Sequence, residues 1–331
     1  MRIPEALKTN RISKHKISEI AEAWIEGKAD FPNMVSSSIL HQIADELCKS
    51  HDIARVREFV NEAANHSSAQ SFSVLRSIIS HVDPLFYTRG APPRFDRSRD
   101  FQLLKTHRSA RNLLVVFLGN SMRLFAPMEL VQVLLAFHEW DILYIGDRTR
   151  TAYLNGNETY PSQQSLIEAI QKVANQGQHD RIVTLGSSAG TFAALQYAVP
   201  LRATHVIGLA GPTFFSRQTE NPAVQMLNKR MTAQPASFKN AELDALTDDL
   251  RSLSPQIRYY YGDGCKKDVV AARHLDKSGL GKSFPLVKHD NHTVMDAILD
   301  LGVFQADLAA ASEDEAFLFA DEFKARANVG K

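Results

Sequence analysis

The segment GSSAG (186–190) carries the clearest chemistry in the sequence. It has the pattern G-x-S-x-G and lies between a β-type run, RIVTLG (181–186), and a helical run rich in small residues. In this strand–turn–helix setting, the central serine occupies a sharp and strained turn, where its hydroxyl stands clear of the sheet. The residues two before and two after it must be glycine-sized, because a β-carbon there would collide with neighbouring chain. Ser188 is therefore the candidate nucleophile.

A flexible turn and a nucleophilic Ser187 are the two other interpretations of this segment. Serine and glycine are common in flexible turns, so the pentapeptide alone does not establish a catalytic site. The strand before it and the helix after it favour the nucleophile. Ser187 is not the expected nucleophile, because the two glycines are spaced symmetrically about Ser188. The first turn of the following helix also presents free backbone N–H groups toward any oxyanion that forms there.

With this motif in this setting, the chain from about residue 100 onward resembles the α/β-hydrolase fold family. The resemblance implies a catalytic triad in the chain order serine, acid, histidine. It implies a serine hydrolase that cleaves an ester or related acyl bond through an acyl-enzyme on Ser188. The implied partner is a small-molecule acyl substrate, and no cofactor is expected.

The resemblance implies that the acid follows a late strand, and QIRYYYGDGCKKD (256–268) supplies two aspartates. Asp263 lies in the predicted turn at the end of that strand. Asp268 lies just before the helical pattern VVAARHL, which matches the acid position of the family better, so we favour Asp268. The alternative for either side chain is a cap on the next helix.

The resemblance also implies a histidine after the last strand, and SFPLVKHDNHTVMDAIL (283–299) supplies His289 and His292. His289 belongs to the end of the predicted strand. His292 opens a predicted helix over 292–301, the loop-to-helix position that the family uses, so we favour His292. A solvated or capping histidine is the alternative. The H-x-x-H spacing has no carboxylate or cysteine set beside it, and we expect no metal site.

In the family, backbone N–H groups bind the oxyanion. By resemblance, Ala189 supplies one of them, and the loop after the run LLVVFLG (113–119) supplies the other. The family usually places an H-G-x turn there, and GNS (119–121) stands at that position in this chain. Asn120 is therefore the expected second donor. Leu118 replaces the usual histidine, so either the loop is supported differently or the oxyanion hole is weaker.

A polar segment, DRTRTAYLNGNETY (147–160), follows the predicted strand DILYIG (141–146). Ligands of open α/β sheets bind beyond the carboxyl ends of the strands. Arg148, Arg150 and Tyr153 are therefore candidate substrate contacts, and either arginine could hold an anionic group through a bidentate contact. An ordinary polar loop with surface arginines is the alternative interpretation.

Six short apolar runs are expected to form strands: 113–119, 141–146, 181–186, 205–210, 256–262 and 283–289. Amphipathic helical patterns lie between most of them. This rhythm favours an α/β fold, in which a mainly parallel sheet is covered by helices on both faces, as in the α/β-hydrolase type. The stretch 211–254 has no convincing strand and is a candidate helical cap above the site.

The chain changes character near residues 88–100. Before that point, apolar residues recur at helical spacing in four runs, which predict four short antiparallel helices. TRGAPPRFDRSRD (88–100) contains two prolines, a glycine and four arginines, and is typical of a linker. We therefore predict an N-terminal helical domain over 1–90, a linker over 91–100 and an α/β domain over 101–331.

Composition excludes several classes of function. The hydrophobic share of 44% in 331 residues allows a full core, and the formal net charge of +1 does not suggest a nucleic-acid partner. The two cysteines, Cys48 and Cys265, are too few for a disulfide framework, so we expect a cytoplasmic protein. No signal-type apolar run opens the sequence, and no run approaches the roughly 18 apolar residues of a membrane span.

Other functions share this fold or this site. An acyltransferase would use the same triad with an acceptor other than water, and a peptidase or lyase would share it too. A catalytically inactive scaffold would instead use the predicted N-terminal helices as a partner-binding module, although the order of serine, acid and histidine weighs against it. The same helices are candidates for a homodimer contact.

Overall fold

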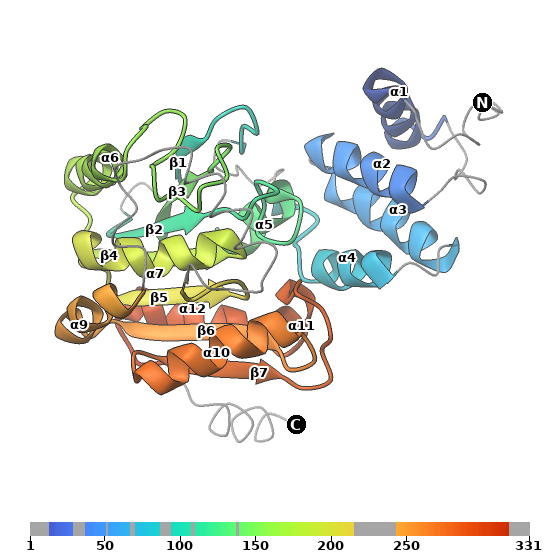
Figure 1. Ribbon diagram of the computed structural model, residues 1–331. Coiled ribbons are helices and arrows are strands. Elements are labelled where there is room, and N and C mark those ends of the chain that lie inside the picture. Colours follow the sequence, from blue (N-terminus) through green and yellow to red (C-terminus); the bar gives the residue numbers. More distant parts are fainter. Residues whose placement is uncertain are drawn as a thin grey trace. The chain divides into compact units, whose positions relative to one another are not determined.

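The computed structural model describes residues 13–28, 37–50, 52–66, 70–86, 94–106, 110–136, 139–214 and 243–317. The chain divides into two compact units (Figure 1). One comprises Met1–Pro92 with Ala126–Phe137, and the other comprises Pro93–Phe125 with His138–Lys331. The segment 126–137 lies inside the range that the sequence assigns to a single α/β domain. A short stretch between two strands therefore groups with the N-terminal helices.

The first unit is helical. Its helices are α1 (Lys14–Ile25), α2 (Ser37–Ser50), α3 (Ile53–His66), α4 (Gln70–Ser80) and α5 (Met128–Leu135). α1 contacts α2, α2 contacts α3, α3 contacts α4, and α5 contacts α2. The apolar stripes face inward, and the rings of Trp24 and Phe59 meet edge to face with centroids 5.4 Å apart. The four helices predicted before residue 88 are confirmed.

The described residues of the second unit form a seven-stranded sheet with the strand order β1-β3-β2-β4-β5-β6-β7. Among these strands, β1 runs antiparallel beside β3, and the other neighbours are parallel. The strands are β1 (Phe101–Lys105), β2 (Asn112–Phe117), β3 (Trp140–Ile145), β4 (Arg181–Ser187), β5 (His205–Leu209), β6 (Gln256–Gly262) and β7 (Lys282–Leu286). The six predicted strands are β2 to β7, and β1 is an additional edge strand.

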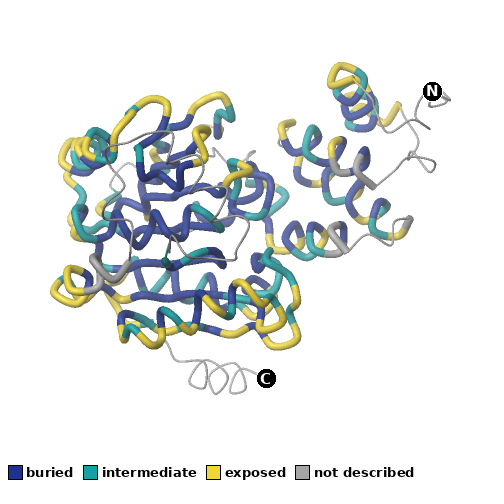
Figure 2. The backbone as a smooth tube through the Cα atoms, in the orientation of Figure 1, coloured by how far each residue is buried: buried dark blue, intermediate teal, exposed yellow. Residues whose placement is uncertain are grey.

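The helices of this unit are α6 (Gln163–Gly177), α7 (Ala189–Leu201), α9 (Leu243–Leu253), α10 (Lys266–Ser278), α11 (Met295–Asp300) and α12 (Val303–Glu313). In Figure 1, α7 and α10 lie in front of the sheet and α12 lies behind it. Figure 2 shows that the strands between them are mostly buried. Among the described residues, no helix combines the length and the hydropathy needed to cross a membrane.

Alternate side chains of β6 show that helices cover both faces of the sheet. Ile257 and Tyr259 belong to an apolar core that also contains residues of α6, α7 and α10. The intervening Arg258 and Tyr260 bond instead to Asp307 of α12. The predicted α/β class, a mainly parallel sheet between two helical layers, is therefore confirmed. The predicted cap over 211–254 falls largely on 215–242, which lie outside the described residues.

Arg258 and Asp307 form a buried ion pair that joins α12 to the sheet. The guanidinium Nε lies 2.9 Å from a carboxylate oxygen, and each side chain is 5% exposed. The Tyr260 hydroxyl also donates to this carboxylate. Burial raises the pKa of the Asp307 carboxyl above its ordinary value, although Arg258 opposes the shift. The position of α12 therefore depends on a buried charged pair.

We expect Asp307→Ala to lower the free energy of unfolding by about 3–5 kcal/mol, because it leaves the buried guanidinium without its carboxylate. Urea unfolding followed by circular dichroism measures this loss. The double variant Arg258→Met/Asp307→Leu should recover most of it, since apolar replacement of a whole buried pair is often tolerated. A single variant as stable as wild type would contradict this role for the pair.

Candidate catalytic site

Ser188 occupies a strained turn between β4 and α7. Its φ of 51° and ψ of −122° lie outside the regions that residues with a β-carbon favour. Its N–H donates to the Leu209 carbonyl at 3.0 Å, and its carbonyl accepts from the Thr191 N–H at 3.0 Å. The side chain is half-buried. Neighbouring backbone on β5 and α7 therefore holds the turn in a conformation that it would not adopt alone.

Three glycines around this turn lie where a β-carbon would clash with backbone atoms. A β-carbon on Gly186 would lie 2.0 Å from the carbonyl oxygen of Gly190, and one on Gly190 would lie 2.1 Å from that of Phe117. A β-carbon on Gly211, whose φ is +98°, would lie 2.1 Å from the carbonyl oxygen of Ser188. The first two glycines are those of the G-x-S-x-G pattern. Gly211 is a third requirement, which the pattern does not reveal.

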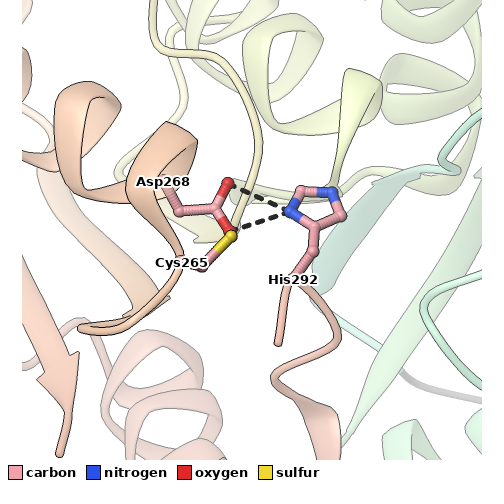
Figure 3. Close-up of side chains that lie close together, drawn as sticks. All are labelled: Cys265, Asp268 and His292. Carbon is pink, nitrogen blue, oxygen red and sulfur yellow. Dashed lines mark hydrogen bonds and ion pairs between the residues drawn. The ribbon is translucent and has the colours of Figure 1, made fainter. Parts of the chain in front are cut away.

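His292 lies between Ser188 and Asp268. Its Nε2 is 3.0 Å from Ser188 Oγ, and its Nδ1 is 2.9 and 3.0 Å from the two carboxylate oxygens of Asp268. Figure 3 shows the carboxylate facing Nδ1. Asp268 stands in the first turn of α10, but His292 lies in the loop before α11, not in the helix predicted over 292–301. The ring of Phe125 packs edge to face on the imidazole, with centroids 5.3 Å apart.

The environment of Asp268 favours its ionised form. The carboxylate is 1% exposed and accepts the N–H of Gly211 at 3.3 Å. Burial alone would raise the pKa of the Asp268 carboxyl, but hydrogen bonding to His292, the His292 charge, and hydrogen bonds from Cys265 and Gly211 outweigh it. The pKa of Asp268 therefore lies below its ordinary value. An ionised carboxylate here can hold the proton of the imidazole on Nδ1.

Asp263 and His289 lie outside this chain of contacts. Asp263 is exposed, and its carboxylate accepts the backbone N–H of His289 at 3.2 Å. The His289 ring nitrogen Nε2 is 2.7 Å from the carbonyl oxygen of Thr293. Of each candidate pair, the structure brings the favoured residue to Ser188, while the other residue stabilises the loop after β7.

The loop that carries Asn120 runs beside Ser188. A β-carbon on Gly119 would lie 3.1 Å from the Ser187 carbonyl oxygen and 3.3 Å from the Ser188 β-carbon, so Gly119 lies close to this turn. The hydroxyl of Ser187 donates to the Arg123 carbonyl at 3.0 Å and ties the turn to this loop. Asn120 is exposed, and Ala189 begins α7, where N–H groups have no intrahelical acceptor. Both expected oxyanion donors thus belong to segments that border Ser188.

Tyr153 supports the loop after β2 through its hydroxyl. Its phenol oxygen is 2.7 Å from the Leu118 carbonyl oxygen and 2.8 Å from that of Ile145, and the residue is fully buried. Its N–H donates to Asp147 at 3.0 Å. Burial raises the pKa of the phenol well above its ordinary value, so it remains a donor. We expected Tyr153 to contact the substrate, but the residue is fully buried. It holds the backbone at Leu118 instead, the position at which the α/β-hydrolase family usually has a histidine.

The two arginines lie on the exposed loop after β3. Arg148 donates to the Arg97 carbonyl at 2.7 Å, and its Nε is 3.8 Å from Glu158. Arg150 is exposed and has a φ of 57°. Across the described ranges, no hydrogen bond or ion pair joins either arginine to Ser188. Their contact with a substrate stays a prediction.

Cys265 also lies beside the site, which the sequence did not indicate. Its Sγ, a carboxylate oxygen of Asp268 and a ring nitrogen of His292 all lie within 4.8 Å of one another. Burial raises the pKa of the Cys265 thiol, and so does its hydrogen bond to Asp268. The thiol therefore stays protonated and donates. The only local signal was its spacing, three residues before Asp268, at the start of a helix.

No protein-family model matches the chain, and no curated protein matches it. Solved structures match at low identity. A carboxylesterase structure from the thaumarchaeon Nitrososphaera gargenis is 13% identical with a TM-score of 0.46, covering 65% of this chain and 95% of that one. Brefeldin A esterase, a bacterial homologue of human hormone-sensitive lipase, is 14% identical with a TM-score of 0.44, covering 75% and 87%. AbyA5 is 15% identical with a TM-score of 0.45, covering 89% and 93%. The function is therefore inferred from the site itself.

Proposed function

We propose that this chain is a serine hydrolase that cleaves an ester or related acyl bond through an acyl-enzyme on Ser188. The observation that carries the proposal is the line of contacts from Asp268 through His292 to Ser188, at 2.9 and 3.0 Å. A serine hydroxyl is a poor nucleophile until a base within hydrogen-bond distance accepts its proton. The strained turn supports the same proposal, because a turn of this kind between a strand and a helix is typical of a nucleophilic serine.

In the first half of the reaction, Ser188 Oγ attacks the acyl carbon while Nε2 of neutral His292 takes the hydroxyl proton. Asp268 holds the other ring proton on Nδ1 and stabilises the imidazolium. The tetrahedral intermediate then breaks the bond to the leaving alcohol, which receives the proton from Nε2. The products are the free alcohol and an ester of Ser188.

In the second half, water replaces the alcohol. His292 takes a proton from the water as its oxygen attacks the acyl carbon, and it returns that proton to Ser188 Oγ when the ester bond breaks. The acid leaves and the site is restored. An acceptor alcohol in place of water would give acyl transfer by the same steps.

Both tetrahedral intermediates carry a negative oxygen. The backbone N–H groups of Ala189 and Asn120 are the proposed donors to it, and the loss of one such donor costs about 3–4 kcal/mol of transition-state stabilisation. The closeness of Gly119 to the Ser188 turn supports this assignment. Because the donors belong to the backbone, their positions depend on the residues that support the loop.

Burst kinetics with p-nitrophenyl esters of increasing acyl length test the proposal. With an ester whose acyl-enzyme forms faster than it is hydrolysed, we expect a rapid release of one p-nitrophenol per active site, followed by slower turnover. The dependence on acyl length reports the depth of the acyl pocket. Products formed with a competing alcohol separate hydrolysis from acyl transfer. No turnover of any ester in the series would contradict the proposed hydrolysis.

We expect Tyr153→Phe to lower kcat about tenfold with little change in KM. The Leu118 carbonyl loses its donor, the Gly119–Asn120 turn shifts, and a misplacement near 1 Å can cost up to about 10²-fold. Steady-state kinetics of ester hydrolysis measure the effect.

Tyr197→Phe is the matched control. It removes a hydroxyl-to-carbonyl hydrogen bond of 2.7 Å in the same core, from Tyr197 to Tyr153, at a similar cost of about 1 kcal/mol of stability. It leaves the Leu118 carbonyl bonded. Equal losses of kcat in the two variants would show a general loosening of the core and would contradict a positioning role for Tyr153.

A further inference from the structure

We infer that Cys265, Asp268 and His292 form an inhibitory binding site for zinc or a similar soft divalent ion. Sulfur, carboxylate oxygen and ring nitrogen lie within 4.8 Å of one another. Figure 3 shows the thiol and the carboxylate on the same side of the imidazole. Cysteine, histidine and aspartate are the ligand types that zinc takes in proteins. The binding stands on this geometry alone, whereas the inhibition rests on the proposed function.

The spacing of the three donors suits a tetrahedral ion. Zinc bonds of about 2.0–2.3 Å place neighbouring donors about 3–4 Å apart. His292 Nδ1 and Asp268 are already 2.9 Å apart, and the thiol sulfur lies within 4.8 Å of both ligand atoms. Cys265 and Asp268 both belong to the start of α10, which fixes two of the three ligands on one helix.

An ion can reach these donors from solvent. Cys265 is half-buried rather than enclosed. The His292 side chain is 23% exposed, although Asp268 behind it is 1% exposed. The site therefore combines a buried carboxylate, which other residues already hold in place, with two half-buried ligands.

Helix capping does not explain why position 265 is a cysteine. Cys265 is the N-cap residue of α10, where serine, threonine, aspartate and asparagine are preferred because their oxygens accept N–H groups of the first turn. Its side chain makes no capping hydrogen bond. A serine would supply a cap and a donor to Asp268, but it would not supply a soft sulfur ligand.

Zinc on Nδ1 would reverse the tautomer that the proposed mechanism needs. In that mechanism, the ring proton lies on Nδ1 and Nε2 accepts the Ser188 proton. A zinc ion takes the lone pair of Nδ1, so the one ring proton moves to Nε2, and the thiol releases its own proton to solvent. Nε2 then donates to Ser188 and cannot act as a base. One ion binds, one proton leaves, and hydrolysis stops.

Titration of untagged protein with Zn²⁺ during p-nitrophenyl ester hydrolysis tests the inhibition. We expect loss of activity that EDTA restores. In Cys265→Ser, the half-inhibiting concentration should rise by about 10- to 100-fold, a loss typical for disturbed metal sites. Cys48→Ala is the matched control, because Cys48 is the other cysteine and is fully buried in α2. It should be inhibited like wild type. Equal inhibition of Cys265→Ser and wild type would overturn the proposal.

Cobalt binding separates this site from the proposed reaction. Co²⁺ on a thiolate gives a ligand-to-metal charge-transfer band in the near ultraviolet, and its appearance requires no hydrolysis. We expect the band in wild type and in Cys48→Ala and its loss in Cys265→Ser. A band without esterase activity would keep the metal site and contradict the proposed function. Esterase activity without the band would keep the proposed function and overturn the metal site.

Discussion

Replacing Ser188 with alanine is expected to lower kcat for p-nitrophenyl ester hydrolysis by about 10⁴- to 10⁶-fold, because the variant cannot form the acyl-enzyme. The change removes one oxygen from a half-buried side chain. The fold should therefore persist, and circular dichroism checks that it does. Steady-state and burst kinetics measure the loss, and the burst of p-nitrophenol should disappear with it.

The neighbouring Ser187 provides a matched control. Its hydroxyl is fully buried and donates to the Arg123 carbonyl at 3.0 Å, away from His292. Ser187→Ala removes the same atom one residue earlier and should keep kcat within about tenfold of wild type, since only one supporting hydrogen bond is lost. Similar losses in the two variants would contradict the choice of Ser188 as nucleophile.

Asp268→Asn is expected to lower kcat by about 10⁴-fold with a much smaller change in KM. The amide retains the shape of the carboxylate, but it can donate to Nδ1, which favours the wrong imidazole tautomer and removes the charge that stabilises the imidazolium. Kinetics with the same esters measure this loss.

Asp263→Asn is the control for the acid, because Asp263 is the other aspartate in the same turn region. Its carboxylate is exposed and accepts only the His289 N–H among the contacts found in the described chain. We expect wild-type kcat within a factor of about three, as for most surface substitutions. A large loss in Asp263→Asn together with an active Asp268→Asn would reverse the assignment of the acid.

The sequence predicted the parallel strands because their signals are local. β2 and β3 are apolar almost throughout, as expected of strands that are buried on both faces. β1 escaped prediction because it has five residues and only alternate ones are buried. Its place beside β3 is a long-range pairing. The grouping of α5 with the N-terminal helices could not be predicted for the same reason, since it depends on contacts between residues that are far apart in the chain.

In the candidate site, too, residues with local sequence signals could be predicted and the others could not. The turn at Ser188 could be predicted, since the glycines that permit it are two residues away on each side. Asp268 and His292 came from a family resemblance and their positions after strands. Gly211, Tyr153 and Cys265 could not be predicted, because each acts through atoms that only the folded chain brings near. Tyr153 was expected at a substrate and lies instead beneath the loop that carries Asn120.

Covalent labelling with a fluorophosphonate, followed by intact mass measurement and peptide mapping, tests most directly whether Ser188 is an activated nucleophile. We expect one adduct per chain, on the peptide that contains Ser188, and none in Ser188→Ala. Labelling should weaken strongly in His292→Ala, where the hydroxyl has no base. An unlabelled wild-type chain, or an adduct that persists in Ser188→Ala, would contradict the claim that Ser188 is an activated nucleophile.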